Sequence, residues 1–224
     1  MSEEILKDLN LEELRDKFLI FTRKAFQILP KMGKFSVLDI GCGSSMPTME
    51  ILGLSDAEII GIDVDQDALD KLNLKIDRSE FSDRIKIINC SLYDVDFPED
   101  YFDVLWEEGV LHILDLKKSL KVCKKLLKPN GFFVSLETIK WYEGNFNRFS
   151  KHGFKLIEQF LLPEEFWWTD YYSPLEKRLE ELYKKYEGSP NLQKLERYVM
   201  EVKMVKKNPK EFDCGFYIFQ KIDK

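Results

Sequence analysis

The chain has 224 residues, of which 44% are hydrophobic and 33% are charged, so it can bury a core and keep a solvated surface. This composition argues against disorder, collagen-like repeats and a coiled-coil rod. The 34 Lys and Arg against 40 Asp and Glu give a net charge of −6, which argues against a protein that mainly binds nucleic acid phosphates. No stretch of the sequence is long and apolar enough to predict a membrane span.

The cysteines and the N-terminal residues both favour a cytoplasmic location. Cys42, Cys90, Cys123 and Cys214 show neither CxxC nor Cys/His spacing, so we expect reduced thiols and no metal site. The first residues are acidic and then amphipathic, unlike a signal peptide. These features predict a cytoplasmic protein.

The first two thirds of the chain alternate between helices and short apolar strands. Helical spacing of apolar residues predicts a helix over residues 4–29, ended by Pro30 and Gly33. Strands are predicted at residues 35–40, 59–62, 85–88, 102–106 and 132–136, and helices at 47–53, 66–79 and 116–127. Apolar strands that alternate with helices are typical of a doubly wound, mostly parallel sheet with helices on both faces.

The last third has a different pattern. Strands are predicted at residues 154–161 and 212–222, with helices at 174–186 and 192–206 between them. We therefore interpret residues 1–224 as a single domain with four parts: an N-terminal helical cap (1–34), a core of alternating strands and helices (35–162), a helical insertion (163–211) and a final strand (212–224).

The first functional motif is a glycine-containing turn that directly follows the first strand. Glycines at Gly41 and Gly43 allow a ligand to approach the backbone at a helix N-terminus. A dinucleotide fingerprint would have its third glycine where Met46 stands. Asp39 would also repel a pyrophosphate, whereas it would favour a cation. An ammonium and a sulfonium on one nucleoside, as in S-adenosylmethionine, meet this requirement.

The second motif is an acidic residue at the end of the next strand. Asp63 lies 20 residues beyond Gly43, where a carboxylate can accept hydrogen bonds from both ribose hydroxyls. An aspartate at such a position often only caps the next helix. Asp65 or Asp67 can supply that cap here, which leaves Asp63 free to bind a ligand.

In the order and spacing of these motifs, the sequence resembles the class I (Rossmann-like) S-adenosylmethionine-dependent methyltransferases. The resemblance covers roughly residues 35–140. Its motifs lie at residues 37–45, 61–65, 97–104, 110–114 and 127–132. The family implies a seven-stranded, mostly parallel sheet in which only the last strand is antiparallel.

The resemblance also implies roles for individual residues. Asp39 and the backbone of Gly41 would hold the methionine ammonium, Gly43 would permit close approach, Asp63 would bind the ribose and Val64 would pack on adenine. The remaining expected cofactor-binding residues are Cys42, Ser91, Leu92 and Glu107. Two positions depart from the family pattern, because Ser91 replaces a common aspartate and Ser45 replaces the third glycine of the motif.

The sequence offers candidate catalytic residues at the end of the fourth strand and in the segment after it. Glu107 and Glu108 end the fourth strand at the ligand edge, and at least one should face the pocket. Glu108 and His112 are the candidates for a base, if the acceptor must be deprotonated. A histidine at this position more often packs or caps a helix.

Aromatic residues follow the fifth strand and begin the insertion, the two places where this family builds its acceptor pocket. Together with Glu108, the expected substrate-binding residues are Trp141, Tyr142, Trp167, Trp168, Tyr171 and Tyr172. They could instead pack the insertion onto the sheet. Rings mixed with Glu107, Glu137 and Asp170 would suit a cationic acceptor.

The sequence thus predicts an S-adenosylmethionine-dependent methyltransferase that acts on an N, O or S atom of a small-molecule acceptor and releases S-adenosylhomocysteine. A protein or RNA methyltransferase is one alternative, because residues 174–211 carry ten Lys and Arg against seven Asp and Glu. However, Trp106–Gly109 stands where amino-group nucleic-acid enzymes have Asn/Asp-Pro-Pro-Tyr. A non-catalytic S-adenosylmethionine-binding protein is the other alternative. The acceptor and the oligomeric state stay open.

Overall fold

The computed structural model describes residues 2–44 and 46–222, so Ser45 of the glycine motif lies outside the described residues. The chain divides into two compact units. The α/β unit comprises Leu19–Leu161 and Cys214–Lys224, and the helical unit comprises Leu162–Asp213 together with the N-terminal segment through Phe18. Among the described residues, no helix has the length and apolar character that crossing a membrane requires.

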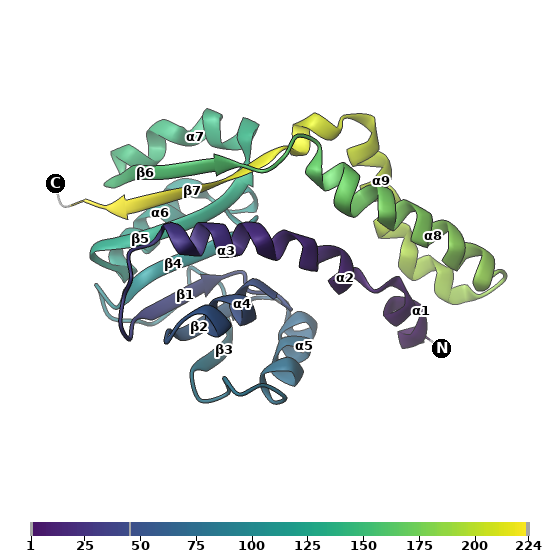
Figure 1. Ribbon diagram of the computed structural model, residues 1–224, viewed down its shortest axis with the longest axis horizontal. Coiled ribbons are helices and arrows are strands. Elements are labelled where there is room, and N and C mark those ends of the chain that lie inside the picture. Colours follow the sequence, from purple (N-terminus) through teal and green to yellow (C-terminus); the bar gives the residue numbers. More distant parts are fainter. Residues whose placement is uncertain (1, 45, 223–224) are drawn as a thin grey trace. The chain divides into compact units, whose positions relative to one another are not determined.

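A seven-stranded sheet forms the centre of the α/β unit (Figure 1), in the order β3-β2-β1-β4-β5-β7-β6. Its strands are β1 (Ser36–Ile40), β2 (Glu58–Asp63), β3 (Ile85–Asn89), β4 (Phe102–Glu108), β5 (Leu127–Thr138), β6 (Phe154–Leu161) and β7 (Cys214–Lys221). The pairs from β3 to β5 are parallel, whereas β7 is antiparallel to both β5 and β6. The predicted fold class is confirmed, including the antiparallel last strand.

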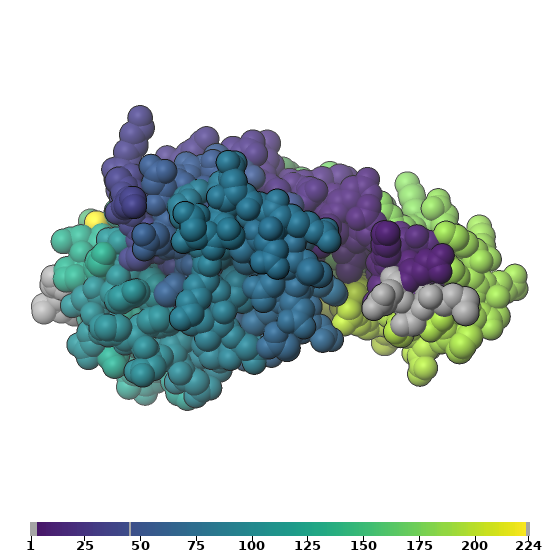
Figure 2. Space-filling model, turned by 90° about the horizontal axis from the view of Figure 1, so that it is seen from below, coloured from purple at the N-terminus to yellow at the C-terminus, as the bar shows by residue number. Residues whose placement is uncertain are grey.

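Helices cover both faces of this sheet, as the buried apolar strands require. They are α3 (Leu19–Ile28), α4 (Met46–Leu54), α5 (Gln66–Ile76), α6 (Leu116–Leu126) and α7 (Ile139–Lys151). Contacts and shared clusters place α3, α4 and α5 on one face and α6 and α7 on the other. In the space-filling view, the segments coloured from blue to teal pack against one another as one face of this unit (Figure 2).

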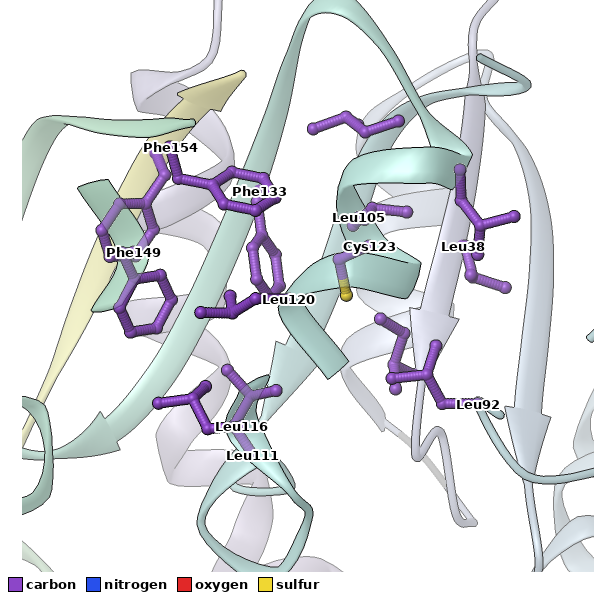
Figure 3. Close-up of a cluster of buried hydrophobic side chains, with 14 of the residues drawn as sticks. Leu38, Leu92, Leu105, Leu111, Leu116, Leu120, Cys123, Phe133, Phe149 and Phe154 are labelled. Carbon is purple, nitrogen blue, oxygen red and sulfur yellow. The ribbon is translucent and has the colours of Figure 1, made fainter. Parts of the chain in front are cut away.

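The main hydrophobic core lies between the sheet and the α6–α7 layer. Leu38 and Leu105 of the central strands face Leu120 and Cys123 of α6 (Figure 3). The rings of Phe149 and Phe219 stack with centroids 4.3 Å apart. This core fixes β1, β4 and β5 relative to one another, and these strands carry most of the candidate site residues.

The N-terminal segment differs from the prediction of one helix over residues 4–29. It consists of α1 (Ser2–Leu9), α2 (Leu11–Arg15), the 3₁₀ turn η1 (Asp16–Phe18) and α3. Asn10 adopts a left-handed conformation with φ 44°, which interrupts the helix between α1 and α2. The guanidinium of Arg178 donates to the carbonyl oxygens of Leu9 and Asn10, so that these groups are satisfied without a continuous helix.

The segment between β6 and β7 is helical, as predicted. It contains a π-helical turn η3 (Trp167–Tyr172), α8 (Ser173–Lys185), the 3₁₀ turn η4 (Pro190–Leu195), α9 (Glu196–Lys207) and the 3₁₀ turn η5 (Pro209–Phe212). The π-helical turn was not predicted.

Two elements of the α/β unit also differ from the prediction. Helix α7 was not predicted, although Thr138 caps it by accepting a hydrogen bond from the amide of Trp141. Strand β5 begins at Leu127, five residues before the predicted start at Phe132, because Leu127 pairs with Phe102 across a register shift.

Candidate functional site

The glycine turn after β1 and the acid that ends β2 lie against each other. The amides of Gly41 and Cys42 donate to the carbonyl oxygen of Ile62, at 2.8 and 3.0 Å. The amide of Gly43 donates to Oδ2 of Asp63 at 2.8 Å. Two motifs that are 20 residues apart therefore form one edge of the sheet.

The backbone of the turn needs glycine for two separate reasons. Gly41 and Gly43 have φ values of 72° and 53°, in the left-handed region that disfavours other residues. A Cβ atom on Gly41 would also lie 2.3 Å from Cγ2 of Val110. At Gly43 a Cβ atom would meet, among the described residues, only Asp63 Oδ2, at 3.8 Å, so these residues leave the space in front of Gly43 open. The turn is thus packed behind Gly41 and accessible at Gly43.

Asp63 is held in a fixed orientation by the backbone. Its Oδ1 accepts from the amide of Asp65 at 2.8 Å, and Asp65 in turn caps α5. Each carboxylate oxygen can accept more than one hydrogen bond, so Asp63 retains acceptor capacity for two neighbouring hydroxyl groups. Val64, beside it, is 72% exposed and offers an apolar surface at the same edge.

Asp39 is a buried carboxyl group on β1, next to this edge. It accepts a hydrogen bond from the hydroxyl of Thr48 on α4. Burial raises the pKa of Asp39 from 3.8 to about 7, although the Thr48 hydroxyl opposes the rise, and the nearby charge of Asp63 adds to it. A cationic ligand would stabilise the ionised form of Asp39, so the residue fits an ammonium group.

Glu108, at the end of β4, shares the α3–α4 face with Asp39. Its Oε1 accepts from the hydroxyl of Thr22 and from Nε1 of Trp106, both at 2.9 Å. Burial raises the pKa of Glu108 from 4.5 to about 7, opposed by these hydrogen bonds and increased by the charge of Asp39. Glu108 can therefore take up a proton near neutral pH.

Glu107 points to the opposite face of the sheet and is fully buried. Its carboxyl group accepts from the hydroxyl of Ser135 and from the amide of Val110. Burial and the nearby charge of Glu137 raise the pKa of Glu107 well above its ordinary value. The structure thus gives Glu107 internal partners, and its predicted contact with the cofactor stays a prediction.

His112 lies in the 3₁₀ turn η2 (Leu111–Ile113), which follows β4. Its Nδ1 is 3.1 Å from Oε2 of Glu137, near the end of β5. The hydrogen bond to Glu137 raises the pKa of His112, while partial burial opposes the rise. His112 is therefore paired with a buried acid, and the sequence did not predict this pairing.

Residues after β3 complete the edge beside Asp63. The amide of Cys90 donates to the carbonyl oxygen of Asp63 at 3.0 Å. Ser91 accepts from the amide of Tyr93 through its hydroxyl at 3.2 Å, and Leu92 is buried. Cys42 is also buried, so its side chain packs inside the protein. None of these placements tests a contact with the cofactor.

The aromatic residues predicted to bind substrate lie in two places. Trp141 and Tyr142 belong to α7, where the rings of Tyr142 and Tyr217 stack at 3.5 Å. The Tyr142 hydroxyl is buried and lacks a hydrogen-bond partner among the described residues. Trp167, Trp168, Tyr171 and Tyr172 belong to the helical unit, where they are partly or fully buried.

Part of the second aromatic group packs within the helical unit. Phe18 contacts Trp167, with ring centroids 4.1 Å apart, and Tyr171 is almost fully buried. Asp170, expected near a cationic acceptor, forms an ion pair with Lys17 at 3.7 Å. For these residues the structure shows packing, and their contact with a substrate stays a prediction.

The site prediction missed Thr22, Thr48 and Ser135, and it named Glu137 only as an acid that would suit a cationic acceptor. The hydroxyl groups carry no sequence signal, because each is useful only beside a carboxylate from another element. Glu137 does carry one, since it stands near the carboxyl end of a predicted parallel strand, as Asp39, Asp63 and Glu107 do. The rule that ligands bind at this edge also favours Glu137 as a site residue.

Comparison with known proteins agrees with this geometry. Residues 38–135 match the family model of a methyltransferase domain. The match covers nearly all of the residues that carry the sequence motifs and shows that this region is similar to a methyltransferase domain. The family resemblance expected from the sequence motifs is thereby confirmed.

Curated relatives match over this domain. A ubiquinone biosynthesis O-methyltransferase of Bradyrhizobium diazoefficiens is 32% identical over 130 residues, which cover 58% of this chain and 50% of the relative. A sterol 24-C-methyltransferase of Aspergillus fumigatus is 29% identical over 98 residues, covering 43% of this chain and 26% of the relative. The chain thus spans about a quarter to a half of the length of these relatives.

Solved structures share the fold at low sequence identity. The cyclase SpnF has a TM-score of 0.74 and 16% identity, with 91% of this chain and 81% of that chain covered. A Geobacter sulfurreducens methyltransferase in complex with S-adenosylhomocysteine has a TM-score of 0.70 and 15% identity, with 90% of each chain covered. These similarities establish the fold of the chain.

Proposed function

We propose that the chain transfers a methyl group from S-adenosylmethionine to an N, O or S atom of a small-molecule acceptor. The observation that carries the proposal is the joined edge of Asp39, Gly43 and Asp63. The buried carboxyl group of Asp39 would face the ammonium. The open backbone at Gly43 would lie beside the sulfonium, and the fixed carboxylate of Asp63 would face the ribose. S-adenosylmethionine supplies a methyl group on a sulfonium sulfur that is already activated for displacement.

Different residues would bind the different groups of S-adenosylmethionine. Asp39 and the Gly41 backbone would hold the ammonium, because a buried carboxylate gains most from a cationic partner. Asp63 would accept from the ribose hydroxyls with the acceptor capacity that its backbone hydrogen bonds leave. The exposed Val64 and the Ser91 backbone would contact the adenine. Holding these groups aligns the methyl group and excludes water from it.

For the acceptor, the proposal names a class of molecule and the residues that would contact it. Glu108 and His112 are the proposed candidates for a base that takes a proton from the acceptor. Trp141 and Tyr142 of α7 stay the proposed acceptor contacts within the α/β unit, and the aromatic residues of the helical unit stay predictions. Relatives named as acting in ubiquinone, sterol and rifamycin methylation support a small molecule as the acceptor. The net charge of −6 argues against nucleic acid as the acceptor. We also propose a cytoplasmic location.

Calorimetric titration with S-adenosylmethionine and S-adenosylhomocysteine tests the cofactor site. We expect micromolar binding, and a loss of about tenfold or more in Asp63→Ala, because hydrogen bonds to a charged acceptor contribute about 1.5–3 kcal/mol each. Asp67→Ala is the matched control, since this exposed aspartate lies one turn away in α5. Absence of binding to the wild-type protein would overturn the proposal.

A non-catalytic or non-methylating use of the site is the second candidate. The similarity to a protein named as a cyclase shows that this fold also occurs in a protein with another named activity. Incubation with methyl-labelled S-adenosylmethionine and a metabolite extract separates the two candidates. A labelled small molecule supports methyl transfer, whereas binding without any labelled product favours the second candidate.

A further inference from the structure

One buried carboxylate holds both the backbone and the ring of His112. The amide of His112 donates to Oε1 of Glu137 at 3.0 Å, and Nδ1 of the ring lies 3.1 Å from Oε2. The Glu137 side chain is 1% exposed, whereas the His112 side chain is 47% exposed. The imidazole is thus anchored on its inner side and open on its outer side.

The position of His112 along the chain places it at the cofactor edge. It stands two residues after Val110, whose side chain packs directly on Gly41 of the glycine turn. Glu137 comes from β5, the strand next to β4, where Leu136 pairs with Glu108. His112 therefore lies between a residue that packs on the glycine turn after β1, Val110, and its own partner on β5, Glu137.

The hydrogen bond to Glu137 decides which ring nitrogen can act on a ligand. A carboxylate at Nδ1 favours the tautomer that carries its proton on Nδ1. Nε2 then keeps a free lone pair, and no described residue hydrogen-bonds to it. A positioned nitrogen lone pair at an open edge is the arrangement that a general base needs.

We propose that His112 is the general base of the reaction, that Glu137 is its positioning residue, and that the acceptor is a hydroxyl compound that keeps its proton near neutral pH. This inference rests on the proposed function and narrows its acceptor class. The acceptor oxygen forms a bond to the methyl carbon while the sulfur–methyl bond breaks. The hydroxyl proton moves to Nε2 of His112, and the carboxylate of Glu137 stabilises the resulting imidazolium.

Groups around the pair set its dependence on pH. Glu107 on β4 faces Glu137 from the same side of the sheet, and Cys123 of α6 and Tyr217 of β7 lie close to these acids. Burial and the charge of Glu137 raise the pKa of Glu107, which favours the neutral form of Glu107 beside Glu137. The raised pKa of His112 means that the rate rises with pH through a value above the ordinary 6.5. Replacing Glu137 by a neutral group should move this rise in rate to lower pH.

Nitrogen-15 NMR of the imidazoles tests the geometry without any acceptor. We expect the Nδ1–H tautomer for His112 and a pKa that falls in Glu137→Gln, which preserves an acceptor for the His112 amide. The chain contains two histidines, so His152→Gln assigns the signals and serves as the matched control. An Nε2–H tautomer, or an unchanged pKa in Glu137→Gln, would overturn the proposal.

Methyl transfer to two probes tests the chemistry. Catechol keeps its hydroxyl protons at neutral pH, whereas pyridine has no proton to lose when it is methylated. We expect His112→Gln to lower kcat for catechol by about 10²–10⁴-fold and to remove the rise with pH, with little effect on any transfer to pyridine. Glu137→Gln should shift the pH limb of kcat downward, and His152→Gln should leave the profile unchanged.

The outcomes separate this inference from the proposed function. Catechol methylation that His112→Gln leaves intact, or binding of S-adenosylmethionine without catechol methylation at any pH, overturns the inference alone. If calorimetry detects no binding of S-adenosylmethionine to the wild-type protein, the proposed function fails as well.

Discussion

Replacing Asp39 by asparagine should make the free protein more stable and the cofactor complex weaker. In the folded chain burial raises the pKa of Asp39 from 3.8 to about 7, so ionising this group costs about 4 kcal/mol more than in the unfolded chain. The folded state binds the proton more tightly, and this group therefore lowers stability progressively as the pH rises from about 4 to about 7. Above that range the loss stays constant.

Urea unfolding of the wild-type protein and Asp39→Asn at pH 5 and pH 8 measures this effect. The variant can still accept from the Thr48 hydroxyl, so its stability relative to wild type should increase between the two pH values, by at most about 3 kcal/mol. A difference that does not change with pH would refute the reasoning, because it would show that Asp39 titrates at its ordinary value.

The same group should link cofactor binding to protons. A ligand ammonium favours the ionised carboxylate, so at pH 7 about half a proton should be released per S-adenosylmethionine bound. Calorimetry in buffers of different ionisation enthalpy measures this number. Asp39→Asn should release fewer protons and bind more weakly, and equal release by both proteins would contradict the assignment.

Three further substitutions test the surroundings of the site. Gly41→Ala should lower the free energy of unfolding by about 2–4 kcal/mol, because Gly41 has a positive φ and a Cβ atom there would contact Val110. Adding Val110→Ala should restore only part of this free energy. Full restoration would show that the positive φ causes no backbone strain. Thr22→Val removes a donor to Glu108 and should cost about 1–3 kcal/mol in urea unfolding at pH 8, with a smaller cost at pH 5 where Glu108 is protonated; equal costs would refute this. Arg178→Met should speed hydrogen exchange around the break between α1 and α2, and unchanged exchange would show that other contacts hold this segment.

The sequence predicted the elements whose signals are local. Apolar runs such as the one ending at Asp39 and Ile40 identify buried strands, and glycine directly after a strand identifies a ligand-binding turn. The rule that parallel strands end at one edge then brings Gly43 and Asp63 together, as the structure shows. Helix α7 was missed although Thr138 offers a cap and Tyr142, Phe146 and Phe149 recur at helical spacing.

Only the tertiary structure determined where the N-terminal helix is interrupted and which acidic residues have raised pKa values. Asn10 interrupts the first helix with the support of Arg178, which lies 168 residues away. The proton affinities of Asp39 and Glu108 depend on burial and on hydroxyl groups from other elements, and Thr22 is 86 residues from Glu108. Glu137 meets His112 because β5 pairs with β4, and not because of any pattern around either residue. Local periodicity determines the strands and helices, whereas desolvation and side-chain pairing arise only after the strands have assembled.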